Sequence, residues 1–536
     1  MIPNRTLFAH DCLDVLSDTN AFPDKCIDLI YLDPPFNSKA IYNLPFPMKY
    51  KQQEDFKPVM AFNDTWSWND ECIQQLRRLE LGKGEDRTLA ELVKLTRSIR
   101  NEKTYTKDSM SAYLISMAVR LKQMRRVLKT TGSIYLHCDP TASHYLKMLM
   151  DTIFGAGNFR NEIIWKRRQE KHNLPDKTMG KIHEVIFWYG DLNLSEYRKQ
   201  YQPYDEKYLE SHYQKRDSRG QYETFPLTNE KGGNRVYSFK GVSRAWKWSE
   251  DRMNEMFDKD MLVQLTKDGP FRYKKYLEDA QGVPLQDLWT DIDAVRGKQS
   301  LGYPTQKPIE LMSRIIKASS DEGDVILDPF CGCGTTVHAA EELGRCWVGI
   351  DISQFSNGLI RNRLCDNFPF LSKSDIEIRG NPLTISEAQS LALRDAFEFE
   401  KWVCGEIGAE GMYHTPGERG GDGGVDGIIP FYHTSENKKT EQAYSIVQVK
   451  GGKVTPDSVR ALAAVIKQHK DHGFNSVCGV FVCFEKFMQT VENNRDRSKV
   501  KDYFMNRSFD FIQAISVEDL LKGKQPYFPG YRKKAA

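Results

Sequence analysis

The segment 325–351 constrains the fold of this 536-residue chain more than any other. It consists of an apolar run, a glycine-rich turn, a helix-forming stretch and a second apolar run that ends at Asp351. Strand, turn, helix and strand in this order are typical of a parallel α/β sheet of Rossmann type. Gly332 and Gly334 let the backbone approach a ligand closely, and Asp351 is placed to accept hydrogen bonds from a ribose. The segment therefore predicts a cofactor site for NAD, FAD or S-adenosylmethionine.

The rest of the chain favours the same fold class and indicates two domains. Apolar runs of strand length alternate with helical patterns, as in a parallel α/β sheet, and they occupy residues 26–32, 133–137, 162–165 and 183–189. Two blocks interrupt this alternation: residues 38–107 are polar and irregular, and residues 195–285 are rich in charge and aromatics. We predict a first domain over 1–384 with these blocks as insertions, and a smaller α/β domain over 390–525.

Composition excludes several classes without choosing a function. Hydrophobic residues make up 40 % and charged residues 28 % of the chain, which is typical of a folded soluble protein. The net charge of +3 does not by itself indicate a nucleic-acid partner, so any such surface has to be local. The 11 cysteines form no CxxC pair, and no apolar run reaches the roughly 18–20 residues that span a bilayer. We therefore expect a cytoplasmic protein that has no membrane partner.

Three motifs occur in a fixed order along the first domain. Asp33-Pro34-Pro35-Phe36 follows the apolar run 26–32, and the prolines end that strand because they cannot donate to a ladder. Gly-Tyr-Pro-Thr-Gln-Lys-Pro occupies 302–308, and Asp-Pro-Phe-Cys-Gly-Cys-Gly-Thr-Thr occupies 328–336. These motifs resemble those of the amino-group DNA methyltransferases, and their permuted order resembles the β class. The resemblance covers nearly all of residues 1–380.

This resemblance implies a Rossmann-like sheet that binds S-adenosylmethionine. It places the residues of the cofactor site in two groups. The first group would lie at the methionine end of the cofactor: Thr305, Lys307 and Asp328. The second group would complete the site, with the Phe330 ring beside the cofactor: Phe330, Gly332, Gly334 and Asp351.

The resemblance also implies what residues 33–36 do. An exocyclic amine conjugated to an aromatic ring is a poor nucleophile, because its lone pair is delocalised. Asp33 and the carbonyl of Pro34 would each accept one N–H and free that lone pair, while Pro34 and Pro35 fix the backbone. Phe36 would stack on a base flipped out of double-stranded DNA. The acidic first residue favours adenine N6, with cytosine N4 as the alternative; an RNA or protein amine is a third possibility.

Three further expectations concern partners of the first domain. We expect the blocks 38–107 and 195–285 to choose the DNA target, with Trp246 and Trp248 as candidates for base stacking. The basic run Lys166-Arg167-Arg168 is a candidate for phosphate contacts. The family resemblance also suggests a homodimer.

The second domain carries a different set of polar residues. Asp426 follows a glycine turn, and Gln448 and Lys450, two apart on a predicted strand, share one face. An acid, an amide and a lysine on paired strands can hold a divalent ion beside a phosphate. The set resembles the Mrr-like branch of the PD-(D/E)xK nucleases. This implies that Asp426 and Gln448 bind Mg²⁺, that Lys450 orients water and that Glu400 supports the site. The alternative is a DNA-binding module that does not cut.

Overall fold

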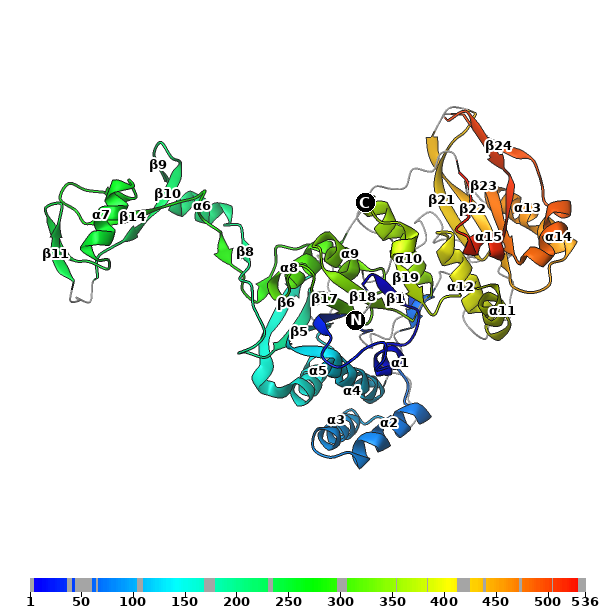
Figure 1. Ribbon diagram of the computed structural model, residues 1–536, viewed down its shortest axis with the longest axis horizontal. Coiled ribbons are helices and arrows are strands. Elements are labelled where there is room, and N and C mark those ends of the chain that lie inside the picture. Colours follow the sequence, from blue (N-terminus) through cyan, green and yellow to red (C-terminus); the bar gives the residue numbers. More distant parts are fainter. Residues whose placement is uncertain are drawn as a thin grey trace. The chain divides into compact units, whose positions relative to one another are not determined.

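The computed structural model describes residues 4–35, 41–43, 60–63, 66–103, 109–167, 179–229, 235–295, 306–352, 354–382, 384–411, 425–436, 440–471, 475–503 and 505–528 (Figure 1). The chain divides into two compact units. One unit is Arg198–Gln286, and the other comprises Met1–Tyr197 together with Asp287–Ala536. Over the described residues, no helix has the length and apolar character that a membrane span requires.

The centre of the larger unit is a nine-stranded sheet with the order β16-β6-β7-β5-β2-β17-β18-β1-β19. Its strands are β1 (Thr6–Phe8), β2 (Ile27–Leu32), β5 (Leu128–Cys138), β6 (Phe159–Lys166), β7 (His183–Gly190), β16 (Leu288–Trp289), β17 (Val325–Asp328), β18 (Cys346–Ile350) and β19 (Glu377–Arg379). β7 runs antiparallel to β5 and β6, and the remaining pairs are parallel. The predicted α/β fold class is confirmed.

Helices cover both faces of this sheet (Figure 1). They are α1 (Cys12–Ser17), α4 (Met110–Val127) and α5 (Ser143–Met150) on one face, and α8 (Ile309–Ser319), α9 (Thr335–Glu342) and α10 (Gln354–Asn367) on the other. Alternation along β5 explains the two layers: Ile134 and Leu136 belong to the buried cluster that includes α4, whereas the Tyr135 hydroxyl lies 2.6 Å from the Ser319 hydroxyl of α8. The apolar residues over 110–127 recur at helical spacing and belong to α4, whose first turn is capped by Ser109.

The block 38–107 is more regular than its sequence suggested. It contains α2 (Asp70–Leu81) and α3 (Glu85–Ile99), besides the two-stranded pair β3 (Ile41–Asn43) and β4 (Met60–Asn63). Leu79 in α2 and Leu89 and Val93 in α3 are buried in the cluster that also holds α4. Our expectation of an irregular block was wrong for these helices, because few apolar positions among many charges suffice when each faces a neighbouring helix.

The unit 198–286 has a small core of its own. Its four-stranded sheet has the order β13-β14-β10-β9, with strands β9 (Lys215–Arg216), β10 (Gln221–Pro226), β13 (Leu262–Gln264) and β14 (Phe271–Tyr276). The hairpin β11 (Val236–Phe239) and β12 (Val242–Ala245) and helix α7 (Glu250–Asp258) complete its buried core. Trp246 is only 2 % exposed within this core, so our expectation that its ring stacks on a base was wrong. The Trp248 ring packs against Tyr273 and lies under the Arg252 guanidinium.

Two strands form the base of this unit. β8 (Tyr201–Gln202) pairs antiparallel with β15 (Val283–Pro284), so the segments that enter and leave the unit run side by side.

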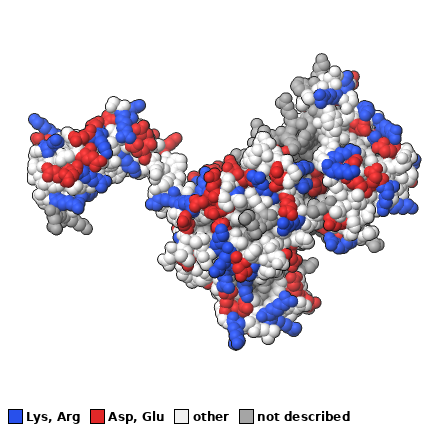
Figure 2. All heavy atoms as spheres, in the orientation of Figure 1, with Lys and Arg blue, Asp and Glu red and all other residues white. Residues whose placement is uncertain are grey.

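Acidic and basic side chains are interspersed over the visible face of the protein (Figure 2), in agreement with the small net charge.

The C-terminal part of the larger unit contains a five-stranded sheet with the order β20-β21-β22-β23-β26. The strands are β20 (Glu410–Gly411), β21 (Gly427–Thr434), β22 (Thr440–Lys450), β23 (Ser476–Cys483) and β26 (Ile512–Ser516), and a short hairpin joins β24 (Lys499–Asp502) to β25 (Arg507–Asp510). The helices are α11 (Ile385–Arg394), α12 (Ala396–Glu406), α13 (Pro456–Asp471), α14 (Met488–Asn494) and α15 (Val517–Leu521).

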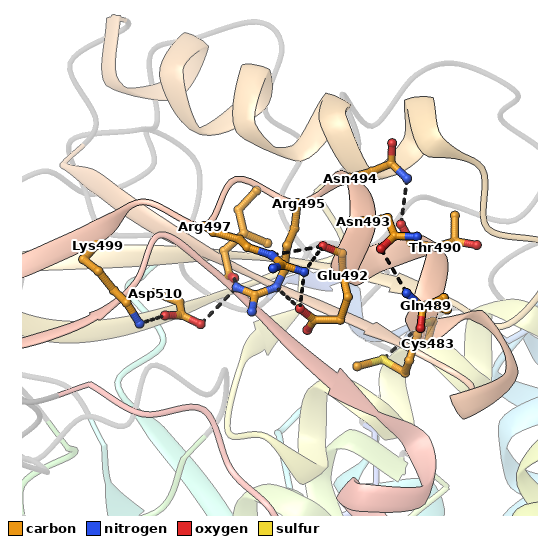
Figure 3. A network of polar contacts seen from close by, with 12 residues as sticks. Cys483, Gln489, Thr490, Glu492, Asn493, Asn494, Arg495, Arg497, Lys499 and Asp510 are labelled. Carbon is orange, nitrogen blue, oxygen red and sulfur yellow. Dashed lines mark hydrogen bonds and ion pairs between the residues drawn. The ribbon is translucent and has the colours of Figure 1, made fainter.

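A polar network fastens α14 to the strands beside it (Figure 3). The Arg495 guanidinium donates to the carboxylates of Glu492 at 3.0 Å and Asp510 at 2.9 Å, and to the carbonyl of Ile512 at 2.8 Å. Its side chain is 12 % exposed, so solvent replaces these bonds poorly.

We expect Arg495→Ala to destabilise the C-terminal domain by about 2–3 kcal/mol, because it removes three hydrogen bonds of a largely buried guanidinium, two of them to carboxylates. Differential scanning calorimetry of the full chain measures the shift in the unfolding transition. Arg460→Ala is the matched control, since the Arg460 side chain is 61 % exposed and its loss should cost no more than about 0.5 kcal/mol. Equal shifts for the two variants would contradict the prediction.

Candidate functional site

The acid-Pro-Pro motif and the glycine turn, far apart in sequence, are brought together by adjacent strands. β2 and β17 are parallel neighbours, with Leu29 opposite Ile326 and Ile30 opposite Leu327. Asp33 directly follows β2, and Asp328 is the last residue of β17. Both carboxylates therefore lie at the carboxyl edge of the sheet, where ligands bind in open α/β folds.

Lys307 links its own segment, just before α8, to the acid of the first motif. Its ammonium group donates to Oδ2 of Asp33, and the Lys307 side chain is only 5 % exposed. The other oxygen of this carboxylate, Asp33 Oδ1, is buried and has no hydrogen-bond partner among the described residues. A buried acceptor of this kind is costly unless a ligand donates to it.

Asp328 is a second buried carboxylate at this edge. Its Oδ1 accepts the Phe330 N–H at 3.0 Å, and the residue is 3 % exposed. Burial raises the pKa of Asp328 to about 7, and the charges of Asp33 and Asp351 add to this rise, although hydrogen bonds from Thr336 and from the Phe330 N–H lower it. A cationic group beside Asp328 would favour its ionised form.

The glycine turn uses backbone angles that favour glycine. Gly332 and Gly334 adopt φ values of 50° and 78°, and a Cβ on Gly334 would lie 2.7 Å from the Ile360 side chain. The Gly332 N–H donates to Oδ2 of Asp351 at 2.8 Å, so the acid that ends β18 borders the turn. Phe330 is partly buried against the core of the sheet.

Two predicted residues lie outside the described residues, namely Phe36 and Thr305, and so does Arg168. Pro34 is buried and Pro35 is half-buried, directly after Asp33. Arg167 donates to Oε1 of Glu184, and its side chain is 29 % exposed, so the phosphate contact of Arg167 stays a prediction.

Sequence reasoning missed several polar residues next to this site. Glu184 on β7 and His137 on β5 are buried, and His137 Nε2 lies 2.9 Å from Glu184 Oε2. Their signal was a charged or titratable residue within an apolar strand run, which is unusual unless it is paired. The loop that follows β1 was also missed: Phe8 pairs with Ile350, which puts this loop at the same sheet edge as Asp351. A strand of three residues gives no periodicity to detect.

In the C-terminal domain, the strand pair β21 and β22 gathers the predicted acid and amide. The Asp426 N–H donates to the Val447 carbonyl at 2.9 Å, and Asp426 Oδ2 accepts the Val449 N–H at 2.6 Å, which places Asp426 beside Gln448. Asp426 and Gln448 are 3 % and 4 % exposed, and Gln448 Oε1 has no hydrogen-bond partner among the described residues. Lys450, at the end of β22, is half-buried.

Glu400 lies on α12, which packs against the end of β22. A Cβ on Gly451 would lie 2.9 Å from the ring of Phe399, so the helix bearing Glu400 is next to the residue that follows Lys450. In the part of the chain that the structure describes, no cluster of three or more His, Cys, Asp or Glu residues is arranged to hold a metal.

The fold is that of a methylase with a Rossmann-like sheet, followed by a smaller α/β domain of restriction-nuclease type. Residues 27–357 match the family model described as DNA methylase, and residues 393–501 match the model described as restriction endonuclease. The chain belongs to the DNA methylase family and carries a C-terminal restriction-endonuclease domain. The predicted fusion is confirmed.

Three relatives extend this comparison. The Type II methyltransferase M.EcaI from Enterobacter cloacae is 29 % identical over 363 residues, which cover 62 % of this chain and 78 % of that one. The StyLTI Mod subunit, a Type III restriction-modification enzyme subunit from Salmonella typhimurium, is 28 % identical over 62 % of this chain and 49 % of its own length. The EcoPI Mod subunit from Escherichia phage P1 is 24 % identical over 75 % of this chain and 62 % of its own length.

Proposed function

We propose that this protein transfers the methyl group of S-adenosylmethionine to adenine N6 in double-stranded DNA, and that its C-terminal domain is a Mg²⁺-dependent endonuclease. One observation carries the first half. Asp33 has one carboxylate oxygen held by Lys307 and a second, buried oxygen without a partner among the described residues. That oxygen suits the N–H of an amino group brought into the site.

The residues of the first motif would prepare this amino group. Asp33 Oδ1 would accept one N–H, and the carbonyl of Pro34 would accept the other, which localises the nitrogen lone pair. Pro34 and Pro35 limit the backbone freedom of both acceptors. When bound, S-adenosylmethionine supplies a methyl group on a sulfonium that a nitrogen lone pair can attack. The proton becomes acidic once the nitrogen carries the methyl group, so Asp33 need not be a strong base.

The charges at the sheet edge fit this cofactor. Asp33, Asp328 and Asp351 end neighbouring strands, and the raised pKa of Asp328 reflects their mutual repulsion besides burial. An ammonium or sulfonium group would offset that repulsion. Asp328 and Lys307, with Thr305, would hold the methionine end; Phe330, Gly332, Gly334 and Asp351 would hold the remainder.

The direct test is to incubate the protein with labelled S-adenosylmethionine and DNA, digest the DNA, and identify the methylated nucleoside by mass spectrometry. N6-methyladenine supports the proposal, whereas N4-methylcytosine establishes the alternative base. Label in RNA or protein but not in DNA would overturn it. Sequencing that detects modified bases then gives the recognition sequence and the strand.

The pKa of Asp328 predicts how cofactor binding depends on pH. Below about pH 7 the carboxyl is protonated and must lose its proton to face a cation, so affinity for S-adenosylmethionine should rise about tenfold per pH unit up to pH 7 and level off above it. Calorimetric titrations between pH 5.5 and 8.5 in buffers of different ionisation enthalpy should show proton release on binding below pH 7. Asp328→Asn should bind weakly with little pH dependence; an unchanged profile in that variant would contradict the assignment.

In the C-terminal domain, Asp426 and Gln448 would hold the metal. The buried amide oxygen Gln448 Oε1 lacks a partner among the described residues, and amide and carboxylate oxygens are ligands of Mg²⁺. When bound, the ion supplies positive charge at a phosphate. Lys450 would orient the attacking water, and Glu400 would support the site. The alternative is a module that binds DNA without cutting, and incubation of methylated and unmethylated DNA with and without Mg²⁺ distinguishes the two.

The remaining partner expectations rest on the same proposal. Arg198–Gln286 and the block 38–107 would contact the DNA target, and Phe36 would stack on the flipped base. The homodimer stays a prediction, which light scattering of the full chain in solution would test.

A further inference from the structure

A buried cluster of polar groups lies behind Asp33, and the proposed chemistry gives a role only to its lysine, Lys307. The groups come from four elements: Tyr31 on β2, His137 on β5, Glu184 on β7, and Lys307 before α8. Each of these residues is at most 5 % exposed. Burying charges is expensive, and such a cluster is weak evidence for a contribution to stability. Its position beside the site calls for another account.

Glu184 is the centre of this polar cluster. Its Oε1 accepts from the Arg167 guanidinium, and its Oε2 lies 2.9 Å from His137 Nε2 and 3.8 Å from Lys307 Nζ. Burial by itself would raise the pKa of Glu184, but Lys307, His137 and Arg167 together hold it well below its usual range. Glu184 is therefore a fixed negative charge at neutral pH.

Lys307 connects that charge to the first motif. The same ammonium group that faces Glu184 donates to Asp33 Oδ2, so one cation lies between two carboxylates. On the other side of the polar cluster, His137 is linked back to β2, since the Tyr31 hydroxyl lies 2.7 Å from His137 Nδ1. The Lys307 side chain thus lies between Glu184 and Asp33. Both carboxylate oxygens of Glu184 face other side chains, Oε1 that of Arg167 and Oε2 that of His137.

We propose that Glu184 is a positioning residue for methyl transfer: it anchors Lys307, which holds Asp33 so that Asp33 Oδ1 stays directed at the amino group of the target base. Without this anchor the Lys307 ammonium loses one of the two carboxylates that it faces and can follow Asp33 out of place. A misplacement of about 1 Å in such a group can lower a rate about 100-fold. This inference rests on the proposed function of Asp33.

Glu184→Gln tests the proposal, because it removes the charge and keeps the size of the side chain. We expect kcat for DNA methylation, measured well below the Tm of the variant, to fall about 10- to 100-fold, with KM for DNA within about threefold of wild type. Glu162→Gln is the matched control: Glu162 is an exposed carboxylate on the neighbouring strand β6, and its loss should leave kcat unchanged. Wild-type kcat in Glu184→Gln would overturn the inference.

A double-mutant cycle separates positioning from a general structural effect. In the Lys307→Met background, the rate loss from Glu184→Gln should shrink to about threefold or less, because the anchored group is already absent. An equal fold loss in both backgrounds would overturn the inference. If Glu184→Gln does not fold, Glu184→Asp keeps the charge but retracts it by one methylene; about tenfold lower kcat supports the proposal, and wild-type kcat refutes it.

The same assays distinguish this inference from the proposed function. If the wild-type protein methylates no DNA, the proposed function fails. If the wild type methylates DNA and the Glu184 variants match it, only the positioning role fails.

Discussion

Asp33→Ala is expected to lower the rate of methyl transfer to DNA about 10³-fold or more, the largest effect of any single substitution in the first domain. The substitution removes the buried acceptor for the target N–H and also the carboxylate oxygen to which the Lys307 ammonium donates. The measurement is single-turnover transfer of labelled methyl at saturating cofactor and DNA. Cofactor affinity should change far less than the rate, since Asp33 faces the base in the proposed complex.

Asp33→Asn refines this test, because it keeps the shape of the side chain. The amide retains one acceptor oxygen, but its nitrogen cannot accept from Lys307. The rate of methyl transfer by Asp33→Asn should therefore also be severely reduced. Asp14→Asn, an exposed carboxylate of α1, serves as the control and should match wild type. A rate within tenfold of wild type for Asp33→Ala would remove the basis of the proposed mechanism.

Lys450→Ala is expected to abolish DNA cleavage, with a loss of about 10³-fold, while methyl transfer stays at the wild-type rate. Lys450 ends β22 two residues after Gln448, where its ammonium group can orient water and stabilise the charge that develops on a phosphate. The measurement is the rate of Mg²⁺-dependent cleavage beside the rate of methylation in the same preparation. Lys453→Ala, an exposed lysine nearby, should cut normally.

The amide of Gln448 in the proposed metal site allows a second test of the nuclease domain. Gln448→Glu adds a negative charge next to Asp426, so the Mg²⁺ concentration for half-maximal cleavage should fall about tenfold. Cleavage that survives Lys450→Ala would place the nuclease chemistry elsewhere, and cleavage by none of the variants or the wild type would favour a module that only binds DNA.

Much of this architecture could be predicted from the sequence because it depends on local signals. The turn at Gly332 and Gly334 uses positive φ angles that favour glycine, and the prolines after Asp33 end a strand in any fold. The order of the motifs then distinguished a permuted methylase from other Rossmann-type sheets. The acid and amide of the second domain likewise meet because antiparallel strands fix their register.

Other features depend on contacts between distant segments, which spacing cannot reveal. The basic run gave no sign that the Arg167 guanidinium pairs with Glu184, which lies on the adjacent strand. Trp246 looked like a stacking surface because aromatic residues surround it in sequence, yet those residues form a small core around it. The pairing of Lys307 with Asp33 likewise depends on how the segment before α8 meets the end of β2.

The paired strands β8 and β15 have an evolutionary consequence. A unit whose chain enters and leaves through one two-stranded stem, and which buries its own core, can be exchanged between genes without disturbing the order of strands in the sheet that holds the catalytic motifs. Under the proposed function, recombination at residues 198 and 286 would be a route to new DNA target sequences that leaves the proposed methyl-transfer residues in place. Chimaeras joined at these two positions would carry their sequence preference with the inserted unit.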